Sequence, residues 1–138
     1  WARSNRSTLV RVPGYRPGHD MSCRLELRSP DPSANPYLAF AVMLGAGLRG
    51  IEEGLEPPAP TEDKNLFNLS RQELRNQGFS TLPENLGEAV ELFAESDLMR
   101  QILGDHIHSY LVAAKRAEWN DYQGAVSQWE QDRYLGVL

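Results

Sequence analysis

The chain has 138 residues, of which 41% are hydrophobic and 24% are charged, and its formal net charge is −5. This is the composition of a soluble globular protein with one domain or part of one. The longest mostly apolar stretch, residues 37–48, is too short to cross a bilayer. The chain has a single cysteine, Cys23, which excludes an internal disulfide and is typical of a protein from a reducing compartment such as the cytoplasm. Because the chain begins at Trp1 rather than at a methionine, we expect it to be a piece of a longer protein.

Basic residues are concentrated at the start of the chain. Residues 1–28 carry six arginines and two acids, a net charge of +4, whereas residues 29–138 carry 8 basic and 17 acidic residues, a net charge of −9. Arginine is the side chain best suited to bidentate contacts with phosphate or carboxylate. The cluster therefore predicts a small anionic ligand. Nucleic acid is the alternative, which the overall acidity and the scarcity of aromatic residues in this stretch disfavour.

Two short strands are predicted first, over residues 7–12 and residues 22–28. The second strand alternates, so that Cys23, Leu25 and Leu27 share an apolar face, which predicts that Cys23 is a core residue. Residues 14–20 form a loop rich in glycine and proline, so the pair is interpreted as a hairpin with a long connection.

Helices are predicted over most of the remainder. The first begins after an N-cap at Asn35 and ends at Gly54, and its glycines at positions 45, 47 and 50 indicate close approach of a neighbouring element. Shorter helices are predicted over residues 70–77, 86–95 and 97–103, the last of them ending at Gly104.

One long helix is then predicted over residues 105–134. Its inward stripe contains Ile107, Leu111, Ala114, Tyr122, Val126 and Trp129. At about 45 Å it is longer than a small domain needs, so we expect it to dock on another part of the protein or on a partner subunit. The fold class is therefore α+β and mostly helical, with a two-strand hairpin-like element in residues 1–28 and a helical part in residues 35–138.

The second strand carries the candidate site. Arg24, Glu26 and Arg28 alternate along it, so their side chains point the same way. They form either a solvated charged face, or the wall of a polar cavity in which Glu26 binds a hard cation and the arginines hold anionic ligands. Arg6 and Arg11 add two cations, but they reach one site only if the first strand is bulged or ends between them. His106 and His108 diverge by about 200° on a helix, so we predict no histidine metal site.

Taken together, these segments resemble the C-terminal part of bacterial-type glutamine synthetase. The matching stretches are Asn5-Arg6-Ser7 with residues 10–13, RLELR at residues 24–28 and PDPSANPYL at residues 30–38, and further downstream residues 63–66 (DKNL) and 80–89. The resemblance covers almost the whole chain but only about the last third of such an enzyme. It implies that the two strands belong to the larger active-site sheet of the catalytic domain, and it favours the cavity interpretation.

The resemblance also implies an activity and a role for each candidate residue. The family forms an amide between the glutamate γ-carboxylate and ammonia through γ-glutamyl phosphate, with ATP as phosphoryl donor. Glu26 corresponds to a carboxylate ligand of Mg²⁺ or Mn²⁺, and Arg28 to the arginine that grips glutamate and its phosphorylated form. Arg6 corresponds to a residue at the transferring phosphate and the glutamate, and Arg11 and Arg24 to ATP-binding residues.

The resemblance further implies a ring-shaped cytoplasmic homo-oligomer of nitrogen metabolism that acts on small molecules, with no nucleic-acid or membrane partner. The family's remaining metal ligands and its catalytic base lie upstream of the matching region. We therefore expect the 138-residue chain to be catalytically inactive on its own.

Three features depart from the family pattern. Residues 14–22 contain no lysine where a nucleotide-contacting lysine is expected, and Phe67 stands where adenylylated enzymes carry tyrosine, so that control by adenylylation is expected to be absent there. The tail over residues 118–135 looks more like relatives that join glutamate to other amines. A ligase that uses methylamine or a polyamine therefore stays open as an alternative, as does a non-catalytic binding or assembly protein of the same family.

Overall fold

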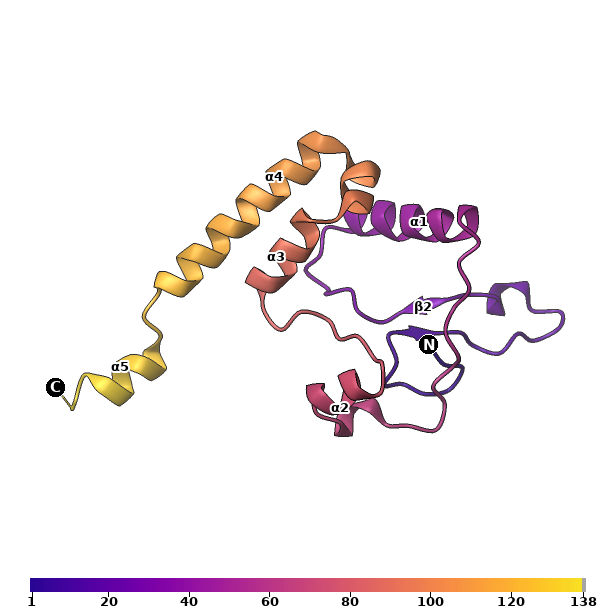
Figure 1. Cartoon of the computed structure of the whole chain (residues 1–138), viewed down its shortest axis with the longest axis horizontal. Coiled ribbons are helices and arrows are strands. Elements are labelled where there is room, and N and C mark those ends of the chain that lie inside the picture. Colours follow the sequence, from indigo (N-terminus) through magenta and orange to yellow (C-terminus); the bar gives the residue numbers. More distant parts are fainter. Residues whose placement is uncertain (138) are drawn as a thin grey trace. The chain divides into compact units, whose positions relative to one another are not determined.

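The computed structural model describes residues 1–137, and its backbone divides into two compact units, one over Trp1–Thr81 and one that begins at Leu82. The first unit holds the strands, β1 (Val10–Arg11) and β2 (Glu26–Leu27), together with helices α1 (Pro36–Glu52) and α2 (Arg71–Asn76). The second holds α3 (Leu86–Ala94), α4 (Asp97–Gly124) and α5 (Gln128–Tyr134). The mostly helical α+β class predicted from the sequence is confirmed (Figure 1).

The two strands pair antiparallel, as the hairpin interpretation predicts, with Val10 opposite Leu27 and Arg11 opposite Glu26. The ladder continues for one step, because the Arg28 N–H donates to the Leu9 carbonyl at 2.9 Å. On the other side of β1, Ala2 exchanges backbone hydrogen bonds with Val10 and Val12, and its side chain is fully buried. The strands are shorter than predicted, since a two-stranded pair has few partners with which to extend regular pairing.

The prediction that Cys23 is a core residue is wrong. Its side chain is exposed, and so is that of Leu25, which is 72% accessible. Cys23 follows a 3-10 turn, η1 (Asp20–Ser22), instead of lying in the strand. Along the apolar face that the alternation predicts, Leu27 is 36% exposed, so only the β2 end of this face is partly covered.

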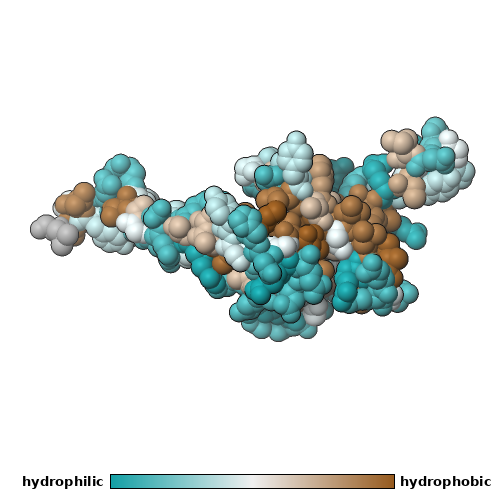
Figure 2. Space-filling model, turned by 90° about the horizontal axis from the view of Figure 1, so that it is seen from above, coloured by the Kyte–Doolittle hydropathy of each residue, from teal (hydrophilic) through white to brown (hydrophobic). Residues whose placement is uncertain are grey.

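Helix α1 has the ends that the sequence predicts. The Asn35 side chain accepts hydrogen bonds from the N–H groups of Tyr37 and Leu38, and Gly54 has a φ of 61°, which suits glycine. The apolar side of the helix is exposed, however, and Figure 2 shows apolar surface over this part of the molecule. A Cβ atom at Gly47 or Gly50 would meet no atom within 4 Å, so the predicted close approach at these two positions is wrong for this chain.

The segment between α1 and the second unit is organised by side-chain caps. Asn65 accepts from the Phe67 N–H and starts a 3-10 turn, η2 (Leu66–Asn68). Ser70 and Glu73 form a reciprocal capping box that starts α2, in agreement with the predicted helix.

The predicted long helix over residues 105–134 is only partly correct. Gly104, with φ 75° and ψ 156°, breaks the helical geometry inside α4, as the sequence predicts. The helix then ends at Gly124, and a second capping box, formed by Ser127 and Glu130, starts the separate helix α5. Most of the predicted inward stripe is wrong, since Ile107 is 39% exposed and Tyr122, Val126 and Trp129 are all more than 60% exposed.

The core of the second unit lies between α3 and α4, which run side by side (Figure 1). Val90 and Val112 are buried, and the imidazole of His108 is only 2% exposed. At the solvent edge of this pair, the guanidinium of Arg116 grips both carboxylate oxygens of Glu91, at 2.8 and 2.6 Å. No helix in the described part of the chain combines the length and hydrophobicity needed to cross a bilayer.

Gly87→Ala is expected to destabilise the α3–α4 pair by about 1–3 kcal/mol, the usual cost of overpacking. A Cβ atom at Gly87 would lie 2.5 Å from Nε1 and 2.7 Å from Cε2 of the Trp119 indole, so the ring would have to leave α3. Urea unfolding of the purified chain measures the change. Gly47→Ala is the matched control, because the same substitution there meets open space and is expected to be neutral or stabilising. Equal effects of the two substitutions would contradict the prediction.

Candidate functional site

The register of the two strands places three of the candidate residues in contact. The guanidinium of Arg11 donates from Nη1 to both carboxylate oxygens of Glu26, at 3.1 and 2.9 Å. Arg24 donates to the same carboxylate from Nε and Nη2, at 3.0 and 2.8 Å. Arg24 lies just before β2 and reaches the same side as Glu26, as the alternation predicts, and Arg11 reaches the Glu26 carboxylate because it lies directly opposite Glu26.

These contacts determine the charge state of the Glu26 carboxylate. Hydrogen bonds from Arg11 and then from Arg24 lower its pKa, and they outweigh the partial desolvation that raises it. Because the folded-state pKa lies below the ordinary value of about 4.3, Glu26 is ionised throughout the neutral range. The pairing of Glu26 with the two arginines stabilises the folded chain fully when the pH is above the ordinary pKa of a glutamate. This stabilisation is lost as the pH falls through the lowered pKa of the folded state.

Arg28 follows Leu27 at the end of β2, and its side chain is exposed. Within residues 1–137 its guanidinium takes part in no hydrogen bond or ion pair. The structure thus does not bring Arg28 into the cluster formed by Arg11, Glu26 and Arg24. It leaves an unneutralised cation on the strand that carries the cluster.

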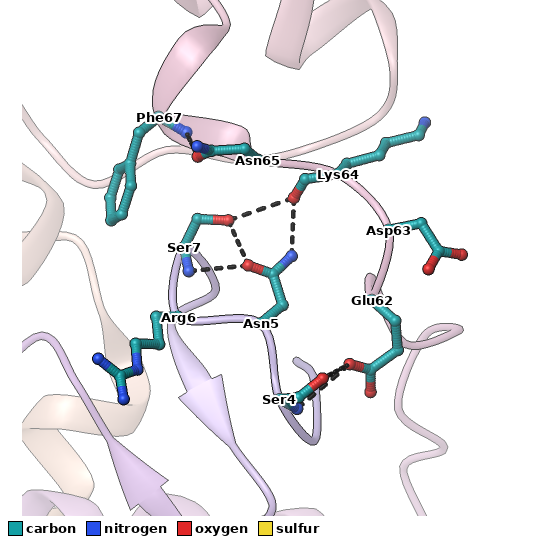
Figure 3. Close-up of a pocket in the computed structure, with 9 residues that line it drawn as sticks. All are labelled: Ser4, Asn5, Arg6, Ser7, Glu62, Asp63, Lys64, Asn65 and Phe67. Atoms are coloured by element: carbon teal, nitrogen blue, oxygen red, sulfur yellow. Dashed lines mark hydrogen bonds between the residues drawn. The ribbon is translucent and has the colours of Figure 1, made fainter.

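Arg6 lies in a turn before β1 begins at Val10, so Arg6 and Arg11 do not share a regular strand. Its side chain lines a pocket of about 430 Å³, whose other lining residues are Ser4, Asn5, Ser7, Glu62, Asp63, Lys64, Asn65 and Phe67 (Figure 3). Like Arg28, the Arg6 guanidinium has no hydrogen-bonding or ion-pair partner in the described chain. The pocket therefore places the unpaired Arg6 guanidinium near Lys64 and also near the carboxylates of Glu62 and Asp63. The group in it that suits an anionic ligand is the Arg6 guanidinium.

The described residues do not complete a metal centre. Hard divalent cations take about six oxygen ligands, whereas residues 1–137 hold no group of three or more His, Cys, Asp or Glu side chains placed around one point. Glu26 offers a single carboxylate, and both of its oxygens accept hydrogen bonds from arginine. It could serve as one ligand only if the others come from outside these residues.

Sequence reasoning missed the part of the site that residues 61–66 contribute. Asn5, Ser7 and Glu62 join this segment to the residues around Arg6, through hydrogen bonds between positions 56 to 59 apart in the chain. Periodicity carries no information at such separations. Asn5, Ser7 and residues 63–66 do belong to the stretches that resemble glutamine synthetase, and for them this resemblance was the signal available.

The family model described as the glutamine synthetase catalytic domain matches residues 1–134. The chain belongs to this family. It is 47% identical over 135 residues to a glutamine synthetase of Clostridium saccharobutylicum, an alignment that covers 98% of this chain and 30% of that protein. It is 44% identical over 138 residues to a glutamine synthetase of Methanosarcina mazei, which covers 100% of this chain and 30% of that protein.

A glutamine synthetase of Thermus thermophilus is also 44% identical, over 137 residues that cover 99% of this chain and 30% of that protein. The chain thus spans about 30% of the length of the curated relatives that it matches. As a glutamine synthetase catalytic-domain sequence, it carries the Arg11, Glu26 and Arg24 cluster and the Arg6 pocket within the matched residues. Phe67, at the edge of this pocket, is 76% exposed, and the absence of control by adenylylation there stays a prediction.

Proposed function

We propose that this chain is the C-terminal part of an ATP-dependent ligase that joins the γ-carboxylate of glutamate to ammonia through γ-glutamyl phosphate. The match of the glutamine synthetase catalytic domain to residues 1–134 carries this proposal. The arginines in residues 1–28 support this proposal, because each step of the reaction develops negative charge that nearby cations must neutralise.

Arg28 and Arg6 are proposed to bind the reacting groups. Arg28 holds the glutamate side-chain carboxylate and its phosphorylated form, and Arg6 contacts the transferring phosphoryl group beside it. Their guanidinium groups suit this role, because within residues 1–137 no carboxylate neutralises them. Arginine does not release its proton near neutral pH, so both residues bind and stabilise anions and neither acts as a base.

Arg11 and Arg24 are proposed to bind ATP, and Glu26 to supply one carboxylate ligand to Mg²⁺ or Mn²⁺. When bound, such an ion neutralises phosphate charge and orients the phosphates. The two arginines hydrogen-bond to the Glu26 carboxylate and hold it in one orientation. A fixed carboxylate supports the proposed role of Glu26 as a metal ligand. The other metal ligands would come from the part of the enzyme outside this chain.

We further propose that the whole enzyme is a cytoplasmic, ring-shaped homo-oligomer and that the 138-residue chain is inactive alone. Residues 1–28 would carry the site and residues 35–138 the helical part of the domain. Several large apolar side chains are highly exposed in this chain, among them Tyr37, Ile51, Trp129 and Leu135. Their exposure supports the proposal that other parts of the enzyme or other subunits cover them. Amide formation from ATP, glutamate and ammonium by the purified chain would contradict its inactivity.

The experiment that tests the function is phosphate release from ATP by the full-length enzyme, with glutamate, Mg²⁺ and a panel of amines. Turnover with ammonium is the expected result. Turnover only with methylamine or a polyamine would instead identify a relative with another acceptor, as the resemblance of residues 118–135 suggests. No turnover with any amine would favour a non-catalytic binding or assembly protein.

A further inference from the structure

The side chain of Asn5, next to Arg6, has all of its hydrogen-bonding groups engaged. Its Nδ2 atom donates to the carbonyl oxygens of Thr61 and Lys64, both at 2.7 Å. Its Oδ1 atom accepts from the N–H of Ser7 at 2.9 Å and from the Ser7 hydroxyl at 2.7 Å. A carboxamide has two donor hydrogens and two acceptor lone pairs, so this residue is saturated (Figure 3).

Two neighbouring groups strengthen the same connection. The Leu66 N–H donates to the Ser7 hydroxyl at 3.0 Å, and the Glu62 carboxylate accepts from the backbone N–H groups of Arg3 and Ser4. On the other side of Asn5, its carbonyl accepts from the hydroxyl of Thr8, whose side chain is buried. The backbone on both sides of Arg6 is therefore held against residues 61–66.

The Arg6 side chain itself takes no part in these bonds. It is exposed, and in Figure 3 it extends away from the hydrogen bonds that join Asn5, Ser7 and Lys64. Binding an anion through a long side chain orders both that side chain and the backbone that carries it, and the backbone part of this entropy cost is absent when the backbone is already fixed. The hydrogen bonds of Asn5 thus restrict where the guanidinium can reach without neutralising it.

We infer that Asn5 is a positioning residue, which places the Arg6 guanidinium at the transferring phosphoryl group by fastening the turn at Arg6 to residues 61–66. The inference rests on the proposed function, because it takes Arg6 to be a phosphoryl contact. Asn5 acts through Arg6 and does not touch the substrate. An error of about 1 Å in the position of a catalytic group lowers turnover by about 100-fold, so the loss of these bonds should be visible in kcat.

The test compares Asn5→Ala and Asn5→Asp in the full-length enzyme, with phosphate release and thermal unfolding measured on each. Asn5→Asp keeps the acceptor oxygen for Ser7 but loses both donated bonds to residues 61–66, and it preserves the shape of the side chain. Both variants are expected to lower kcat by about 10- to 100-fold, with little change in the KM values for ATP and glutamate. Asn76→Ala, at an exposed position on α2, is the matched control and should keep normal turnover.

A double-mutant cycle with Arg6→Ala separates positioning from a purely structural role. If Asn5 acts through Arg6, adding Asn5→Ala to Arg6→Ala should lower kcat by less than a further threefold, because the cation to be positioned is gone. Independent effects that multiply would overturn the inference, as would normal kcat in a folded Asn5→Asp enzyme. Normal turnover of Arg6→Ala would instead contradict the proposed role of Arg6, so the two failures are distinguishable.

Discussion

Glu26→Ala is expected to lower ATP-dependent phosphate release by the full-length enzyme by about 100- to 1,000-fold, the usual effect of removing one preorganised electrostatic group. The Glu26 carboxylate accepts hydrogen bonds from both Arg11 and Arg24, so its removal leaves two proposed ATP-binding residues without their partner. It also removes the proposed carboxylate ligand of the divalent cation. The initial rate at saturating glutamate, ammonium and ATP measures the loss.

Two further variants separate these consequences. Glu26→Gln keeps an acceptor oxygen for the arginines but loses the negative charge, so we expect it to need a higher Mg²⁺ concentration for half-maximal rate. Glu52→Ala removes an exposed carboxylate on α1 and serves as the control, with unchanged rate and metal dependence expected. An active Glu26→Ala enzyme with normal Mg²⁺ dependence would rule out the role proposed for this residue.

His108→Ala is expected to destabilise the α3–α4 pair by about 2–4 kcal/mol. The His108 ring is 2% exposed and stacks on the Phe93 ring, with 4.8 Å between the ring centroids. Its Nε2 lies 3.0 Å from the Phe93 carbonyl oxygen, which can only accept, so Nε2 carries the proton and donates. Alanine would leave a cavity and remove the hydrogen bond from Nε2 to the Phe93 carbonyl, which keeps its other hydrogen bond, from the Ser96 N–H at 3.2 Å. Since whole domains are stable by roughly 5–15 kcal/mol, this is a large share.

His106→Ala is the matched control for this measurement, because it removes the same side chain two positions earlier on α4, where it is exposed. Urea unfolding of the purified chain is followed by tryptophan fluorescence after Trp1 and Trp129 are replaced by phenylalanine, so that Trp119 on α4 alone reports on this helix pair. We expect the midpoint to fall clearly for His108→Ala and to stay near its original value for His106→Ala. Equal midpoints for the two variants would show that the buried imidazole does not hold the helices together.

The helix starts were predictable because each depends on residues within one turn. Asn35 caps α1 through N–H groups two and three positions away, and Ser70 caps α2 in the same way. The same kind of local signal, the capping box that begins at Ser127, was available for α5 but was outweighed by the apolar period along residues 105–134. Because the apolar period continues through residues 124–127, the predicted helix ran across a break that Gly124 and Ser127 specify locally.

Burial was less predictable than helix position. Alternation placed Cys23 and Leu25 on one apolar face, and helical periodicity placed Tyr122 and Trp129 on another, yet all four are exposed in this chain. An apolar face becomes buried only where a partner surface exists, and periodicity does not reveal whether the chain contains one. The chain spans about 30% of the length of its curated relatives, so such partner surfaces need not lie within its own residues.

The sequence by itself determined the starts of α1 to α4, the antiparallel pair of strands and the family, because each rests on local residue patterns or on conspicuous stretches such as RLELR and PDPSANPYL. Only the tertiary structure decided that Arg11 meets Glu26 across the two strands and that Asn5 fastens the turn at Arg6 to residues 61–66. These contacts join positions between 15 and 59 residues apart. Their geometry depends on strand register and on the path of the intervening loops, which no local pattern specifies.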